Sequence, residues 1–208
     1  MEYLRDPDAI YAQSFAAIRA EADLSGFVTD ARDIAIRIIH ACGMTDITDD
    51  LRISEEFSNA ARKSLSAGMP ILVDAEMVRF GIVSSRLPDN VSVICSLNDP
   101  NAKEIGVRDR TTRSAAAVEL WKPHLADALA VIGNAPTALF ALLEMIDAGG
   151  PKPAAIVAFP VGFVGAAESK VELVREPRGV PYATLLGRRG GSAMAAAVVN
   201  AVAMSMTA

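Results

Sequence analysis

Three glycine-punctuated turns decide the fold, and they read IGNAPTALF (132–140), PVGFVGAAESK (160–170) and GRRGGS (187–192). Each turn follows a short apolar run that is typical of a strand and leads into a segment that is typical of a helix. Successive strand–turn–helix units of this kind predict an α/β fold with a mostly parallel sheet covered by helices on both faces. The three units are expected at 129–148, 154–174 and 180–205.

The same turns are candidate anion-binding sites. Glycine lets a backbone approach a ligand closely, and the start of a helix offers unpaired N–H groups to an anion. Three such turns at one edge of the sheet predict a binding floor for a large, negatively charged ligand. For any single turn, a tight connection without a ligand is an equally simple explanation.

Before these units, the sequence predicts a helical N-terminal segment. Asp6 is expected to cap a helix that starts at Pro7. Thr29 is expected to cap a second helix, which ends at Gly43, and Ser54 to cap a third.

Two strands are expected between the N-terminal helices and the three units. They are the apolar runs at 69–74, which ends on a carboxylate, and at 91–95. The charge-dense stretch 98–110 predicts a mobile loop. A helix that starts at Thr111 or Thr112 and contains Trp121 is expected to follow it.

Composition limits the class of protein. A chain of 208 residues with 51% hydrophobic and 22% charged residues predicts one folded domain, 1–208. A net charge of −5 and only 5% aromatic residues disfavour a general nucleic-acid binder. Cys42 and Cys95 are expected to be reduced core residues of a cytoplasmic protein. No signal peptide is expected, and the apolar run 193–203 is too short to span a membrane.

Common cofactor motifs match poorly. The chain has no P-loop string, and a dinucleotide fingerprint is matched only in part, at Gly162 and Gly165. A nucleotide-binding oxidoreductase is therefore a minor alternative. His40 and Cys42 point in different directions on a helix, so no metal site is expected, and no serine-hydrolase elbow is present.

The second helix carries two stripes. One is apolar and packs inward, and the other is polar and contains Asp30, Asp33, Arg37 and His40. A solvated face with an Asp33–Arg37 ion pair is one interpretation of the polar stripe. The other is functional: a guanidinium and an imidazole one turn apart could bind a carboxylate and donate a proton to the same ligand.

Several segments together resemble the precorrin-8X methylmutase (precorrin isomerase) family over most of the chain, from about Ile10 to Asn200. Besides the three turns, the resemblance rests on IHACG (39–43), PILVDAEMV (70–78) and TRSAAA (112–117). The resemblance implies a cofactor-free isomerase of cobalamin biosynthesis that moves a methyl group from C-11 to C-12, converting precorrin-8X to hydrogenobyrinate. It also implies an α/β homodimer with its active site near the subunit interface. His40 falls on the catalytic histidine of the family, and Ser14 and Arg37 fall on substrate contacts.

The chemistry agrees with the residues. A [1,5]-sigmatropic methyl shift needs a macrocycle held in one geometry and a proton placed to polarise it, and His40 is the expected general acid. The carboxylates of the substrate suit helix N-termini and arginine forks. The same reaction on cobalt-precorrin-8 and a non-catalytic corrinoid carrier are the alternatives. The expected substrate-binding residues are Ser14, Arg37, Met77, Arg113, Asn134, Gly162, Lys170, Arg188, Gly190 and Ser192.

Overall fold

The computed structural model describes residues 1 and 3–206. Within them, six strands form one sheet in the order β1-β6-β5-β4-β2-β3, and all neighbours are parallel except β1 and β6. The predicted mostly parallel sheet is confirmed. The strands are β1 (Leu51–Ile53), β2 (Ile71–Val73), β3 (Val93–Cys95), β4 (Leu129–Ile132), β5 (Ala155–Ala158) and β6 (Tyr182–Leu185).

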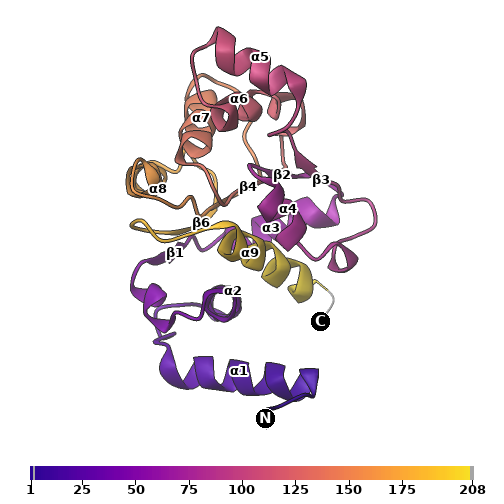
Figure 1. The fold of residues 1–208 in the computed structure, drawn as a ribbon, viewed down its shortest axis with the longest axis vertical. Helices are drawn as coiled ribbons and strands as arrows, with labels where there is room; N and C mark the ends of the chain where they lie inside the picture. Colours follow the sequence, from indigo (N-terminus) through magenta and orange to yellow (C-terminus); the bar gives the residue numbers. More distant parts are fainter. Residues whose placement is uncertain (2, 207–208) are drawn as a thin grey trace.

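Helices cover both faces of the sheet because the strands are apolar on both sides. In β4, Leu129 and Val131 pack into one core cluster, whereas Ala130 and Ile132 pack into the other. In Figure 1, α2 and α9 lie on one side of the sheet and α6 and α7 lie on the other. The first cluster includes residues of α2 (Thr29–Cys42), α3 (Phe57–Ser66), α4 (Glu76–Gly81) and α9 (Ser192–Ser205), and the second includes residues of α6 (Arg113–Glu119), α7 (Pro136–Asp147) and α8 (Ala166–Arg175).

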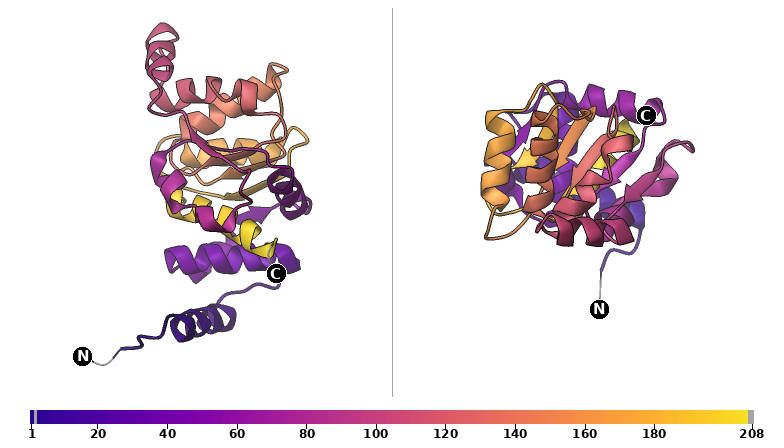
Figure 2. Two further views of the ribbon diagram at one scale, coloured as in Figure 1. Left: turned by 90° about the vertical axis from the view of Figure 1, so that its right-hand side faces the viewer. Right: turned by 90° about the horizontal axis from the view of Figure 1, so that it is seen from above.

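The helical N-terminal segment forms two further layers. Helix α1 (Pro7–Glu21) is the outermost, and α2 lies between it and α9 (Figures 1 and 2). Asp6 caps α1 as predicted, accepting the Asp8 N–H. Because α2 packs on both sides, Ile36 and Ile39 are buried in addition to the predicted apolar stripe. In α1, by contrast, only Ile18 is buried.

The stretch predicted to be a mobile loop is a helix, so that prediction was wrong. It forms α5 (Pro100–Arg108), which lies at the end of the molecule farthest from α1 (Figure 2). Asp99 caps this helix by accepting the Asn101 N–H at 2.8 Å, with Pro100 in the first turn. The same Asp-Pro signal marks α1, but the density of charge in the stretch obscured it here.

Three helix boundaries also differ from expectation. Helix α2 begins at Thr29 itself, without a side-chain cap. Helix α3 begins at Phe57, and the Ser54 hydroxyl instead accepts the Tyr182 N–H at 2.9 Å, which ties the start of α3 to β6. Thr112 caps α6, which ends before Trp121. Short 3-10 helices complete the description: η1 (Thr45–Asp49), η2 (Ser84–Arg86) and η3 (Lys122–His124).

Strand β1 was not predicted, because the charged Arg52 interrupts the apolar run between Leu51 and Ile53. It pairs antiparallel with β6, Arg52 facing Thr184 in register, and closes one edge of the sheet. No helix in the described part of the chain has both the length and the apolar character that a membrane span requires.

Candidate functional site

The last turn of α2 carries His40, and α1 lies across it. Ser14 Oγ is 2.9 Å from His40 Nδ1, within hydrogen-bond distance. The rings of Phe15 and Tyr11 lie 5.2 and 5.5 Å from the imidazole, measured between centroids. Because Ser14 occupies Nδ1, the other ring nitrogen, Nε2, is left to exchange a proton with a ligand. The His40 side chain is exposed, so a ligand can reach it.

Local sequence places His40 at this helix end. Gly43 adopts a left-handed conformation with φ of 69°, and its N–H donates to the Ile39 carbonyl at 2.7 Å. Such a C-cap ends the helix at Cys42, two residues after the histidine. Since Ile39 and Ile36 are buried, the helix is fixed in rotation and His40 is directed outward beside α1.

Arg37 lies one turn before His40 and is half-buried. Its guanidinium carbon is 5.1 Å from the centre of the Tyr11 ring and 5.2 Å from that of Phe15, and its Nη2 donates to the sulfur of Met204. Burial lowers the pKa of Arg37, and the Tyr11 hydroxyl partly offsets this effect. No ion pair between Arg37 and Asp33 forms among the described residues. Ser14 contacts His40, and Arg37 lies against the Tyr11 and Phe15 rings that also flank His40, so the structure brings Ser14, Arg37 and His40 to one place.

The first turn binds an anion, but the anion belongs to the protein. The Asp74 carboxylate, at the end of β2, accepts the N–H groups of Gly133, Asn134 and Ala135 at 2.8, 3.0 and 2.8 Å. Asp74 is only 2% exposed. Burial raises the pKa of Asp74, and the three hydrogen bonds oppose that shift. The expectation that these N–H groups are free for a ligand is corrected, because an internal carboxylate satisfies them.

The second and third turns are hydrogen-bonded to each other. Gly191 donates to the Phe159 carbonyl at 2.8 Å, and Gly162 donates to the Arg188 carbonyl at 3.2 Å. A Cβ at Gly190 would lie 2.4 Å from the Phe159 oxygen, so this glycine is required for contact between turns. Gly162 has a φ of 139° and open space beside it, which leaves it available to a ligand.

Lys170 is not an exposed cation, although a site that binds an anionic ligand at the three turns would require one. It is fully buried, and its Nζ donates to the Arg189 carbonyl at 2.6 Å. Burial lowers the pKa of Lys170 to about 8. Arg189 in turn contacts Asp46 at 2.7 Å and Asp50 at 3.2 Å, which links the third turn to the segment that follows α2.

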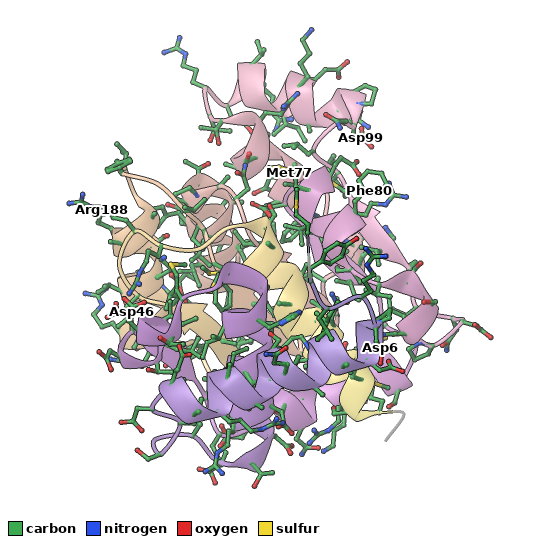
Figure 3. The ribbon with its side chains drawn as sticks, turned by 60° about the horizontal axis from the view of Figure 1, so that its bottom comes forward. Asp6, Asp46, Met77, Phe80, Asp99 and Arg188 are labelled. Carbon is green, nitrogen blue, oxygen red and sulfur yellow. The ribbon has the colours of Figure 1, made fainter. Side chains whose placement is uncertain are left out.

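The remaining predicted residues are spread along the edge of the sheet. Met77 is 63% exposed on α4, next to Phe80, and Arg188 lies well apart from both (Figure 3). Arg188 stacks on the Phe163 ring at 5.4 Å. Arg113 is exposed at the start of α6, beside the Thr112 hydroxyl that lies 2.8 Å from the Thr137 hydroxyl of α7. Ser192 is half-buried in the first turn of α9.

The predicted residues thus fall into two groups. Among the described residues, no hydrogen bond, ion pair or ring contact joins His40 to the three turns.

Sequence reasoning missed Asp74 and Arg189, although a buried strand that ends on a carboxylate was a usable signal for Asp74. The described residues contain no group of three or more His, Cys, Asp or Glu side chains that could hold a metal ion.

Comparison with known proteins identifies relatives over nearly the whole chain. The profile of a family described as precorrin-8X methylmutase matches residues 9–205. A precorrin-8X methylmutase from Pseudomonas aeruginosa is 58% identical, with 98% of each chain covered, and one from Sinorhizobium sp. is 54% identical, covering 97% of this chain and 96% of the relative. Several relatives named cobalt-precorrin-8 methylmutase are 31–36% identical.

Solved structures agree with the sequence comparison. The precorrin-8X methylmutase of Thermus thermophilus superposes with a TM-score of 0.85 at 35% identity, and 95% of each chain is covered. The arrangement of sheet and helices is therefore that of a known enzyme fold.

Proposed function

The chain belongs to the precorrin-8X methylmutase family, and we propose that it converts precorrin-8X to hydrogenobyrinate by moving a methyl group from C-11 to C-12. It is an isomerase, an intramolecular methyl mutase of cobalamin biosynthesis. The metal-free substrate is favoured over cobalt-precorrin-8 because relatives named for the former are 58 and 54% identical, against 31–36% for the latter.

In this proposal, His40 is the general acid. The contact of Ser14 Oγ with Nδ1, at 2.9 Å, orients the ring so that Nε2 faces the ligand, and this contact is the observation that carries the proposal. A proton given to the conjugated macrocycle near ring C would polarise it while the methyl group migrates. Because an isomerisation leaves the composition of the substrate unchanged, the proton is returned to the imidazole at the end of each cycle. Such catalysis contributes on the order of 10²–10⁴-fold.

Ser14 and Arg37 serve orientation and binding. Ser14 holds the imidazole, and the Arg37 guanidinium binds a carboxylate of the substrate. The turn at Gly162 and the exposed cations Arg113 and Arg188 are proposed to contact the macrocycle and its other arms.

Assembly and location complete the proposal. We propose one domain that acts as a homodimer in the cytoplasm. The dimer is supported by large apolar side chains at the surface: Phe163 is 86% exposed, Val164 88% and Phe80 81%. Phe163 and Val164 are adjacent in the chain, and a contiguous exposed apolar patch can mark an interaction surface. Light scattering should therefore give twice the mass of the 208-residue chain.

The decisive test is conversion of precorrin-8X, followed by absorbance. We expect His40→Ala to lower kcat by about 10²–10⁴-fold with an unchanged melting temperature, because the side chain is exposed. Ser14→Ala should lower kcat less, since it only orients the ring. His124→Ala is the matched control, and it should behave as wild type.

Three other results would contradict parts of the proposal. Undiminished turnover by His40→Ala would remove this residue from the mechanism. Binding of precorrin-8X by the wild-type protein without spectral conversion would indicate a corrinoid carrier. Faster turnover of cobalt-precorrin-8 in a parallel assay would reverse the choice of substrate.

A further inference from the structure

Two arginines from different elements converge on one sulfur atom. Arg37 Nη2, from α2, and Arg86 Nη1, from η2, both donate to the thioether of Met204 in the last turn of α9. A thioether is only a weak acceptor, whereas a guanidinium is a strong donor that matches carboxylate geometry. Neither arginine forms an ion pair within the described residues. Six arginines do have carboxylate partners, and they are Arg62, Arg79, Arg108, Arg175, Arg178 and Arg189. What distinguishes Arg37 and Arg86 from the other arginines without an ion pair is that both converge on one sulfur atom.

The two like charges are close enough to affect each other. Burial lowers the pKa of Arg37, and Arg86 lowers it further by repulsion. An anion between the two guanidinium groups would relieve this repulsion. Arg37 is half-buried and Arg86 is exposed, so the pair lies where a ligand from solvent can reach it.

A third polar group beside the pair makes no well-formed hydrogen bond. The Tyr11 hydroxyl is buried, and its interaction with the Arg37 guanidinium, which opposes the fall in the pKa of Arg37, does not reach hydrogen-bond geometry within the described residues. The Tyr11 ring lies under the Arg37 guanidinium, at 5.1 Å, and a buried hydroxyl without a good hydrogen bond is destabilising. The only other buried side-chain atom of this kind in the described chain is the Trp121 indole nitrogen, which lies in the core.

The segment that carries Arg86 is held in place. The Asn200 side chain accepts the Val83 N–H at 2.9 Å and donates to the Gly81 carbonyl at 3.0 Å, so it fixes η2 against α9. Arg86 therefore projects from an anchored turn. The cluster is also adjacent to the candidate acid, since the Tyr11 and His40 ring centroids are 5.5 Å apart.

We propose that Arg37, Arg86 and the Tyr11 hydroxyl form one subsite for a carboxylate arm of the macrocyclic substrate. Arg86 and Tyr11 are the new assignments, and they rest on the proposed function, which supplies a substrate with peripheral carboxylates. A carboxylate arm bound at this subsite anchors the macrocycle next to His40, because the Tyr11 ring contacts both the subsite and the imidazole. Arg86 is then a residue for binding and not for proton transfer.

The experiment compares full-length variants in two assays. One measures kcat and KM with precorrin-8X, and the other measures the Kd of hydrogenobyrinate by absorbance. Arg86→Gln should raise KM and Kd by about 10–100-fold and change kcat by less than about 3-fold, since a charge-assisted bond to the ligand is lost. Arg86→Lys should restore part of the affinity, and Tyr11→Phe should weaken binding by a few-fold. Arg108→Gln, an exposed arginine of α5, is the matched control and should behave as wild type.

A derivative of hydrogenobyrinate whose carboxylates are converted to amides distinguishes loss of the arginine–carboxylate contact from a structural effect of the substitution. Wild type and Arg86→Gln should bind this derivative equally well. A loss that persists with the amide, or Arg86→Gln affinity equal to wild type, would overturn the subsite. Inorganic phosphate should compete with hydrogenobyrinate in wild type and less in Arg86→Gln; phosphate binding at the pair without competition would also overturn it. If wild type itself does not convert precorrin-8X, the proposed function fails instead.

Discussion

The glycine-rich turns and the α1–α2 layer differ in how their polar groups are satisfied. In the turns, Asp74 accepts three backbone N–H groups, and Lys170 is bound to the Arg189 carbonyl. Between α1 and α2, the Tyr11 hydroxyl makes no well-formed hydrogen bond within the described residues, and Arg37, together with Arg86 of η2, points at a sulfur atom. The glycine-rich turns, which have the stronger sequence signal, therefore satisfy more of their polar groups within the protein than the α1–α2 layer does.

A glycine-rich turn at a helix start is not by itself a ligand site. A helix N-terminus attracts an anion, but the protein can supply that anion from a neighbouring strand. Here the turns form a rigid frame, and the polar groups that still lack good partners lie next to His40. We therefore expect polar groups without good partners to be the better guide to the ligand in this molecule.

The largest effect should come from removing the internal anion. Asp74→Ala should lower the free energy of unfolding by about 3–5 kcal/mol, because one buried and two part-buried N–H groups lose their acceptor. Urea denaturation measures this change. Asp99→Ala, which removes the exposed cap of α5, should cost only about 1 kcal/mol. Equal losses in the two variants would break the comparison, since the N–H groups of the first turn would then be satisfied without Asp74.

A smaller effect should separate two glycines of the turns. Gly190→Ala should cost about 2–3 kcal/mol, because the new Cβ would lie 2.4 and 2.7 Å from two backbone oxygens. Gly162→Ala meets no atom within 4 Å and is strained only by its positive φ, so about 1 kcal/mol is expected. Thermal unfolding of both variants tests this order. The reverse order would mean that Gly190 is not needed for contact between the turns.

The smallest effect is a pH dependence from Lys170, whose pKa burial lowers to about 8. Above that pH, the unfolded state keeps the proton longer than the folded state, so the free energy of unfolding rises with pH until about pH 10.5. The wild type should therefore gain roughly 1–2 kcal/mol over Lys170→Met between about pH 8 and pH 10. Urea denaturation at several pH values measures the difference. A constant difference would show that the ammonium is not desolvated in the folded protein.

Much of the architecture could be predicted because its signals are local. The Asp6-Pro7 start of α1, the glycine end of α2 and the three strand–turn–helix units each depend on a few neighbouring residues. The convergence of Ser14, Arg37 and His40 followed from the family resemblance and not from spacing alone. Helix α5 and strand β1 were missed, because the density of charge obscured the helix and Arg52 interrupts the apolar run of the strand.

Local patterns in the sequence were enough to infer the family, the parallel sheet and the position of His40 at a helix end. Which polar groups stay available to a ligand depended on packing between distant segments. Asp74 contacts residues 133–135 across about sixty positions of chain, and Arg86 contacts Met204 across more than a hundred. Hydrogen-bond satisfaction depends on such long-range contacts, so the same arginine or turn can belong to a frame or to a binding site, and only packing distinguishes them.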